Sequence, residues 1–269
     1  MSDSQGTLGT TAKVINILAV LAAAAGIGLG LYALSGPLGV WLGMTDFRSG
    51  FDILRRVNPI ADQVAIAGLV VTVLAFAGAL GFKWGNSKRL AILALSGTVV
   101  AALAYFVPES FRPPEGTPPI HDITTDTVNP PEYVAIAPLR ADAANSMEYG
   151  SGRLNSETEL TPALLAQLQQ EAYPDIVPQR FSESVDVIFT RAVEAAESLG
   201  WDIVAAVRDE GRIEATDTTF WFRFKDDVVI YITREGNETV LNARSLSRVG
   251  VSDVGKNAAR LREFFALLK

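Results

Sequence analysis

Three long apolar stretches without charged residues dominate the first part of the chain. They extend over residues 14–34, 64–82 and 90–107, and each is about 20 residues long, enough to cross the hydrocarbon layer of a membrane as a helix. Residues 109–269 contain no comparable stretch. The pattern therefore predicts a three-helix transmembrane anchor over residues 1–108, followed by one soluble domain.

The connection between the first two stretches has a helical pattern of its own. Phe47, Phe51 and Leu54 recur on one face of a helix near residues 45–57, and we expect Pro59 to end that helix. An amphipathic helix of this kind lies in the membrane interface, or it packs on the transmembrane bundle as a linker helix. The sequence leaves both interpretations open.

Small residues form a stripe on the first predicted helix. Gly26 and Gly30 are four residues apart, so they share a face and allow another helix to approach closely. We interpret the stripe as a packing surface among the three predicted helices rather than as a dimer interface.

The basic residues beside the predicted helices favour one orientation. The short connector at residues 83–89 carries Lys83, Lys88 and Arg89 and no acidic residue, which favours the cytoplasmic side. The longer first connector carries three arginines that favour the opposite orientation: Arg48, Arg55 and Arg56. Because the second connector is short and its basic residues are not accompanied by acidic ones, we predict a cytoplasmic amino terminus and a soluble domain on the outer side.

A proline-rich linker, residues 109–118, precedes the soluble domain, which we assign to residues 119–269. The prolines of the linker predict a stiff, extended segment. Within the domain, residues 141–159 are rich in Asn, Ser, Gly and Glu and predict a long surface loop.

Hydrophobic periodicity predicts two longer helices and an antiparallel meander in the rest of the domain. One helix begins with Ser182 as its cap and ends at Gly200, and the final helix begins at Ser252 and Asp253. A shorter helix begins at Thr161. The predicted strands are residues 201–207, 212–216, 220–224 and 239–245. Residues 228–233 are either a continuation of the third strand through residues 225–227 or a further strand. Together they predict a membrane-anchored α+β fold, in which a small antiparallel sheet carries both longer helices on one face.

Charge divides the chain at the same place. Residues 1–108 contain seven basic and four acidic residues, whereas residues 109–269 contain sixteen and twenty-six. Such an acidic domain as a whole is repelled by nucleic acid and by anionic lipid headgroups, so we expect no nucleic-acid partner. It could accept cations, basic proteins or neutral lipids. The sequence has no cysteine and a single histidine, which excludes disulfides, cysteine zinc sites, iron–sulfur clusters and multi-histidine metal sites. We expect neither a metal nor another cofactor.

Five separated motifs carry a resemblance to a known family. They are residues 119–126 (PIHDITTD), 173–175 (YPD), 212–216 (RIEAT), 224–230 (FKDDVVI) and 244–260 (RSLSRVGVSDVGKNAAR). In this order they resemble the uncharacterised domain family 1499 (DUF1499), in its bacterial form with N-terminal transmembrane helices. The resemblance covers nearly all of residues 117–269. It implies a fold and a family but no activity.

Candidate chemistry lies first around the histidine. His121 is followed by Asp122 and, a helical turn further on, by Asp126. Such carboxylates could orient the imidazole as a general base, or complete part of a metal site. A lone histidine after two prolines is more often a hydrogen-bonded structural residue. We favour that role, with Asp122 or Asp126 fixing the ring.

A second polar group lies at the junction between the last predicted strand and the last predicted helix. Arginines beside the N–H groups of a helix start suit a carboxylate or phosphate ligand. In the alternative that we favour, Ser252 and Asp253 cap the helix, and the arginines pair with Glu214, Asp217 or Asp253. The candidate binding residues of this group are Asp217, Arg244, Ser247, Arg248, Ser252, Asp253 and Asn257.

These observations favour a membrane-tethered, non-catalytic binding or scaffold module, an accessory to a membrane complex or an envelope component. We expect its partners to be membrane lipid and other membrane or envelope proteins. We expect it in the inner (plasma) membrane with the domain on the periplasmic side. The alternatives are a lipid or small-molecule binding domain and a hydrolase-like enzyme that uses His121 and nearby carboxylates. An enclosed apolar cavity would favour the first alternative, and a polar pocket joining His121 to Arg244 or Arg248 would favour the second.

Overall fold

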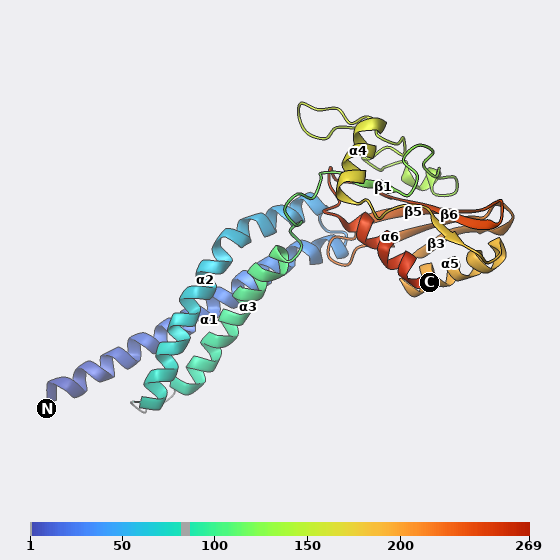
Figure 1. The fold of residues 1–269 in the computed structure, drawn as a ribbon. Coiled ribbons are helices and arrows are strands. Elements are labelled where there is room, and N and C mark those ends of the chain that lie inside the picture. The colour runs from blue at the N-terminus through green and yellow to red at the C-terminus, as the bar shows by residue number, and fades with distance from the viewer. Residues whose placement is uncertain (1, 82–86) are drawn as a thin grey trace. The chain divides into compact units, whose positions relative to one another are not determined.

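The computed structural model describes residues 2–81 and 87–269. It divides into two compact units, of which the first ends at Arg112 and the second begins at Pro113. Figure 1 labels the helices and strands of both units.

The first unit contains three long helices among the described residues: α1 (Ser2–Trp41), α2 (Phe47–Gly81) and α3 (Ser87–Glu109). The parts that are long and apolar enough to cross a membrane are Gly9–Trp41, Phe47–Leu80 and Lys88–Glu109. The predicted membrane-spanning helices are therefore confirmed, and the chain is a membrane protein. Lys83, on which the predicted orientation partly depends, lies outside the described residues.

Helices α1 and α3 pack together through small residues. A Cβ atom at Gly26 would collide with the backbone of Gly97, and one at Gly30 would collide with Val100. A Cβ atom at Gly97 would in turn collide with Ala23. The stripe of small residues on α1 is therefore a packing surface within the bundle, as predicted.

The prediction that the helix near residues 45–57 ends at Pro59 is wrong, because α2 begins at Phe47 and continues through Pro59. On either side of this proline, Val57 and Ala61 are buried against residues of α1 and α3. That packing holds the helix together across the one backbone hydrogen bond that a proline removes.

The linker is also different from its prediction, since it forms turns rather than an extended chain. Pro108 lies inside α3. Gly116, with a φ of 85°, forms a turn in which the Thr117 N–H and hydroxyl donate to the Pro114 carbonyl oxygen at 3.1 and 2.8 Å. Glycine at the third position of the turn supplies the positive φ that the turn requires.

The second unit is built on a sheet that has six strands in the described residues, with every neighbouring pair antiparallel. The order is β1-β6-β5-β4-β3, and β2 pairs with the same edge of β6 as β1 does. The strands are β1 (Asp122–Thr124), β2 (Gln179–Phe181), β3 (Asp202–Val207), β4 (Arg212–Thr218), β5 (Lys225–Glu235) and β6 (Glu238–Ser247).

The predicted strand at residues 220–224 is instead the loop of the β4–β5 hairpin. The Thr219 N–H donates to the Phe224 carbonyl oxygen at 2.8 Å, and the Phe224 N–H donates to the Thr219 hydroxyl at 2.9 Å. Arg223 has a φ of 55°, which no strand residue adopts. Strand β5 instead includes Asp226 and Asp227, two acidic residues that interrupt the apolar pattern. The strand can include them because buried arginines bind their carboxylates.

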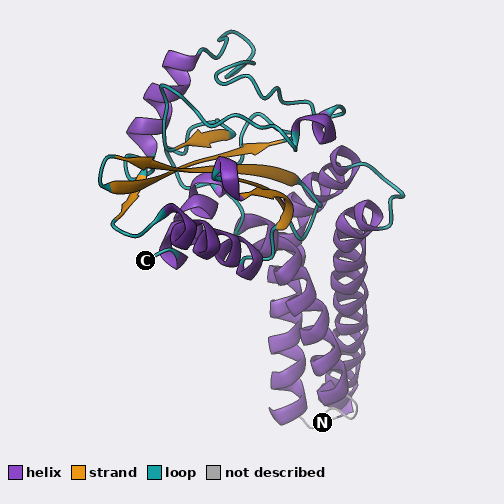
Figure 2. Ribbon diagram, turned by 90° about the vertical axis from the view of Figure 1, so that its right-hand side faces the viewer, coloured by secondary structure: helices purple, strands orange, loops and turns teal. Residues whose placement is uncertain are grey.

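Two helices cover one face of the sheet, as predicted: α5 (Val185–Ser198) and α6 (Lys256–Leu267) (Figure 2). Phe189 of α5 and Leu261 of α6 belong to a buried apolar cluster that includes Ile230 of the central strand. Trp201 stacks on Phe264, with 5.3 Å between the ring centroids. This cluster is the main core of the domain.

The predicted helix cap is confirmed at α4 but not at α5 or α6. Helix α6 begins at Lys256 with Gly255 as its N-cap, rather than at Ser252 and Asp253. Thr161 caps α4 (Pro162–Ala172) as predicted. Ser184, rather than Ser182, caps α5, and its hydroxyl accepts a hydrogen bond from the Val187 N–H at 3.4 Å. Because β2 pairs with β6 as far as Phe181, the chain needs the next residues to turn before the helix can start.

The other face of the sheet is covered by an irregular segment, residues 127–148, which we call the cover loop (Figure 2). Its side chains Tyr133 and Ile136 pack on Val229 and Leu246 of the sheet. In the described part of the chain, two 3₁₀ turns complete the fold: η1 (Ala137–Arg140), within the cover loop, and η2 (Arg208–Glu210).

Candidate functional site

Charged and hydroxyl side chains are buried between the sheet and the cover loop. Side chains alternate along each strand, so Ile213 and Ile230 point to the helices while their neighbours point to the cover loop. We call the second set, with the loop residue that joins it, the cover-loop network: Asp122, Arg140, Arg212, Glu214, Thr216, Asp227, Arg244 and Arg248.

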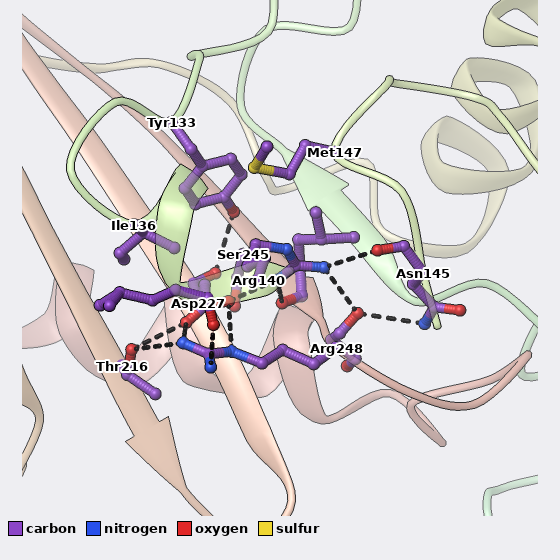
Figure 3. Close-up of polar contacts among 12 residues, drawn as sticks. Tyr133, Ile136, Arg140, Asn145, Met147, Thr216, Asp227, Ser245 and Arg248 are labelled. Carbon is purple, nitrogen blue, oxygen red and sulfur yellow. Dashed lines mark hydrogen bonds and ion pairs between the residues drawn. The ribbon is translucent and has the colours of Figure 1, made fainter. Parts of the chain in front are cut away.

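Asp227 lies at the centre of the network and is fully buried (Figure 3). Its carboxylate accepts hydrogen bonds from the guanidinium groups of both Arg140 and Arg248, the latter through two contacts of 2.8 Å. The Thr216 hydroxyl donates to the same carboxylate at 2.7 Å. Two positive groups therefore compensate one buried negative charge.

The same arginines bind backbone carbonyl oxygens of the cover loop. Arg140 donates to Asn145 at 3.0 Å, and Arg248 donates to Leu139 at 2.9 Å. In the other direction, the Tyr133 hydroxyl donates to a β5 carbonyl oxygen at 2.9 Å. Burial raises the pKa of Tyr133 well above its usual value, so this hydroxyl stays protonated and remains a donor.

Glu214 binds the backbone of the cover loop directly. The N–H groups of Val134, Ala135 and Ile136 donate to its carboxylate at 3.0, 2.9 and 2.9 Å. Arg212 forms an ion pair with the same carboxylate. Three consecutive N–H groups form a natural binding site for an anion, and here a fully buried side chain of the same domain fills it.

Arg244 completes the network. It holds Asp122 through two hydrogen bonds of 2.9 and 2.8 Å, and it donates to the carbonyl oxygens of Pro131 and Met147 at 3.2 and 2.7 Å. Burial opposes the charge of Arg244, but the Asp122 carboxylate outweighs that effect and raises the pKa of the guanidinium. The guanidinium therefore stays charged while it holds the cover loop on β1 and β6.

The segment that forms the sheet, its helices and the cover loop also matches a known family. The sequence model of the family described as "Protein of unknown function (DUF1499)" matches residues 122–268, which is more than half of the chain. The chain belongs to this family. The match confirms the resemblance inferred from the sequence motifs. A search of curated proteins finds no match to the chain.

A second polar group of the DUF1499 domain lies on the helix side of the sheet, at the start of α6. Asn257 donates to the Ser247 hydroxyl at 3.0 Å and to the His121 carbonyl oxygen at 2.8 Å. Arg260, one turn further along α6, donates to Asp217 at 2.8 Å. These contacts tie the helix start to the entry of β1 and to the end of β6.

Neither Ser252 nor Asp253 is the N-cap of α6, but Asp253 binds an N–H group of its first turn, while Ser252 binds the loop that precedes the helix. The Asp253 carboxylate accepts from the N–H groups of Gly255 and Asn257 at 2.7 and 2.8 Å, and the Ser252 hydroxyl accepts from Val254 at 3.1 Å. Burial raises the pKa of Asp253, and its two backbone hydrogen bonds offset part of that shift.

The structure divides the predicted junction group between the two faces of the sheet. Arg244 and Arg248 bind partners on the cover-loop side, whereas Ser247 and Asn257 lie on the helix side. The reason is the alternation of strand residues, because positions an odd number apart face opposite ways. The predicted partners of the two arginines are wrong: the pairs are Arg244–Asp122 and Arg248–Asp227, not pairs with Glu214, Asp217 or Asp253.

His121 is held differently from the prediction. Its Nδ1 lies 3.1 Å from the Val251 carbonyl oxygen. Arg244 binds the Asp122 carboxylate, and the Asp126 carboxylate accepts two backbone N–H groups of the cover loop. The predicted carboxylate partners therefore serve the backbone and an arginine, while a backbone carbonyl fixes the imidazole.

His121 nevertheless lines an open surface pocket of about 400 Å³. Since a carbonyl oxygen can only accept, Nδ1 carries the proton in the neutral ring and Nε2 carries the lone pair. The lining residues are His121, Ala144, Asn145, Ser146, Glu148, Ser151, Gly152, Arg153 and Val251. In the described part of the chain, no three His, Asp or Glu side chains are grouped so that they could hold a metal ion.

Sequence reasoning missed Arg140, Tyr133 and Asp227 as members of a site. Asp227 gave a local signal, since an acid beside an apolar strand needs a partner when it is buried. The other two gave none, because Arg140 and Tyr133 meet their partners 87 and 94 residues along the chain.

Proposed function

We propose that the DUF1499 domain is a membrane-tethered, non-catalytic binding module whose recognition surface is the cover loop. The observation that carries the proposal is the set of hydrogen bonds from Val134, Ala135 and Ile136 to the single carboxylate of Glu214. Long irregular segments are commonly mobile, and those that are not are often functional. This one is fixed to the sheet by contacts between Pro131 and Met147.

The way in which the cover loop is fixed supports a role beyond stability. Buried ion pairs contribute little net stability, because the loss of hydration of each charge offsets the attraction. Their effect here is to hold one backbone conformation. A loop that is already ordered loses little entropy when it binds, so a partner can be recognised with a small contact area.

The outer side of the cover loop offers apolar contacts. Val128 is 82% exposed, and Val134 and Leu139 are each 53% exposed. Apolar side chains on a rigid backbone suit the surface of another protein. We propose that the partner is a membrane complex or an envelope component and that the domain is its accessory or scaffold subunit.

We also propose that the protein resides in the inner membrane with its domain on the periplasmic side. Lys88 and Arg89 at the start of α3 support a cytoplasmic second connector. A reporter that works only after export, fused behind Lys269, should be active. Activity of a strictly cytoplasmic reporter at the same position would reverse the orientation.

The binding proposal is tested by affinity purification of the full chain from mild detergent. The test variant is Val134→Asp with Leu139→Asp, and the control is Val187→Asp, which changes a 46% exposed valine on α5. A true partner should copurify with the wild type and the control but not with the test variant. Recovery of the same proteins with all three chains would refute the proposal. A purified pair should then bind in a reconstituted system.

A second candidate function is binding of a small polar molecule in the pocket beside His121. Its volume lies in the range of ligand sites. His121, Glu148 and Arg153 offer an imidazole acceptor, a carboxylate and a guanidinium at its wall. Neither Arg244 nor Arg248 lines it. His121→Asn separates the roles: if His121 is structural, the variant should lose about 1 kcal/mol of stability and still complement a deletion. A stable variant that fails to complement would favour the ligand-binding or enzymatic alternative.

A further inference from the structure

Three connections meet at one end of the sheet of the DUF1499 domain. The β4–β5 hairpin loop, residues 219–224, lies there because Thr218 pairs with Lys225. The loop from β6 to α6 begins there, since the Arg248 N–H donates to the Lys225 carbonyl oxygen at 3.0 Å. Strand β1 also starts there, because Asp122 pairs near the end of β6. We call this part of the domain the hairpin end.

The hairpin end carries exposed apolar side chains on two loops. Phe220 is 66% exposed, and Trp221, whose ring meets it edge-on at 5.2 Å, is partly exposed. On the second loop, Val251 is 55% exposed and Val254 is 36% exposed. Val254 has a φ of 53°, a conformation that costs a β-branched residue energy and that its surroundings must impose.

The exposed charges of the hairpin loop and its flank are positive, although the domain as a whole is acidic. Arg223 and Lys225 are both exposed. The neighbouring strand carboxylates are each bound by an arginine, in the pairs Asp217–Arg260, Asp226–Arg260, Asp227–Arg140 and Asp227–Arg248. Aromatic side chains flanked by cations match the interface of a phospholipid membrane, where rings meet the upper acyl chains and cations meet phosphates.

The chain enters the domain at this same end. The Asp253 N–H donates to the carbonyl oxygen of the buried Ile120 at 3.1 Å, which fixes the incoming chain beside the β6–α6 loop. Residues 110–119 alone connect α3 to Ile120. Such a segment spans at most about 35 Å when fully extended, and the turn that ends at Thr117 shortens it further. The tether therefore limits how far the hairpin end can move from a membrane that holds α3.

We propose that the hairpin end rests on the phospholipid surface, with Phe220 and Trp221 in the interfacial layer and Arg223 and Lys225 against the lipid phosphates. The exposed aromatic tip, the local positive charge and the attachment of the tether to the same end of the sheet all point to this occupant. The inference rests on residues 219–225 and the tether, whereas the function proposed above rests on the cover loop, so either can fail without the other.

The absence of cysteine from the sequence allows a direct test on the full chain. Phe220→Cys and Asn237→Cys each introduce one thiol for an environment-sensitive fluorophore. They lie in the two turns at opposite ends of β5, so Asn237→Cys is the matched control. The labelled chains are reconstituted at one copy per nanodisc, in phosphatidylcholine with or without phosphatidylglycerol, and brominated lipids serve as quenchers.

We expect brominated lipid to quench the label at position 220 strongly and the label at position 237 weakly or not at all. Arg223→Glu with Lys225→Glu should reduce the quenching at position 220, and more so with phosphatidylglycerol present. If Phe220→Cys fails to fold, Val251→Cys provides a second position on the same end. Equal and weak quenching at 220 and 237 overturns the proposal. Blue-shifted emission of the label at 220 that brominated lipid does not quench also overturns it, because protein then covers the hairpin end. The same holds if the blue shift appears only in nanodiscs that carry two or more copies of the chain.

Discussion

The two faces of the domain sheet are covered in different ways, and their interiors differ accordingly. On the helix side, α5 and α6 bury apolar side chains such as Phe189 and Leu261 against Ile230 and Leu241, apart from the polar group at the start of α6. On the other side, the cover loop lies on carboxylates and guanidinium groups that are equally buried.

The difference follows from where backbone hydrogen bonds are made. A helix satisfies its own N–H and C=O groups between its ends, so the side that faces the sheet can be apolar. An irregular segment needs partners from elsewhere. Glu214 accepts its N–H groups, while Arg140, Arg244 and Arg248 donate to its carbonyl oxygens. A sheet face under a loop thus requires charged side chains that a face under helices does not.

The largest effect should come from removing the shared carboxylate of the network. Asp227→Ala leaves Arg140 and Arg248 buried without their anion, which should lower the free energy of unfolding by about 3–5 kcal/mol. Asp217→Ala is the control, because Arg260 keeps its second partner, Asp226. Pulse proteolysis of the full chain over a urea series measures both. A similar, small loss for both variants would show that the network does not hold the domain together.

The next prediction compares a carboxylate that binds backbone N–H groups with one that only pairs with an arginine. Arg212 pairs with both Glu214, which is fully buried, and Glu210, whose side chain is 55% exposed. Glu214→Gln should cost about 3 kcal/mol, because it also places an amide donor against three N–H groups. Glu210→Gln should cost less than about 1 kcal/mol. Hydrogen exchange should show faster exchange of the amides of residues 134–136 in the first variant alone. Unchanged protection of these amides in Glu214→Gln would show that the buried carboxylate does not hold the cover loop.

A conservative change on the helix side should leave the cover loop intact. Ile230 is fully buried under α5 and α6, and Ile230→Val should cost about 1 kcal/mol for the lost methylene group. Because the loop is held by polar contacts on the other face, its amides should keep their relative protection in hydrogen exchange. Selective loss of protection in the cover loop would mean that the faces are not independent.

The smallest effect concerns an exposed ion pair on the outer side of α6. Hydrogen bonds from Arg262 lower the pKa of Asp175 below its usual value. A lowered folded-state pKa adds stability above the unfolded value, near pH 4, and that stability is lost as the pH falls through the folded value. Asp175→Asn should therefore cost less than about 1 kcal/mol at pH 7, since solvent screens the pair. The difference from the wild type should vanish in acid. A difference that persists at low pH would assign the effect to packing.

The helices and most strands could be predicted from the sequence because their signals are local. The stripe of Ile188, Phe189 and Ala192 repeats at helical spacing and is buried as that spacing requires. The loop at residues 220–224 could not be predicted in this way. Its aromatic residues favour strands, and only the closing bonds between Thr219 and Phe224 make it a loop. Pro59 misleads for a related reason, because the packing of Val57 and Ala61 on either side of it lets α2 continue.

The sequence by itself determined a membrane anchor, an acidic α+β domain, its family and the polar residues worth examining. The tertiary structure decided how those residues are used. Arg244 and Ser247 are three positions apart and bind on opposite faces, while Arg140 and Asp227 are 87 positions apart and form one pair. Periodicity reports which side of a strand a residue occupies, but a buried charge is stable only beside a partner that folding brings from elsewhere. That partner is absent from any local pattern.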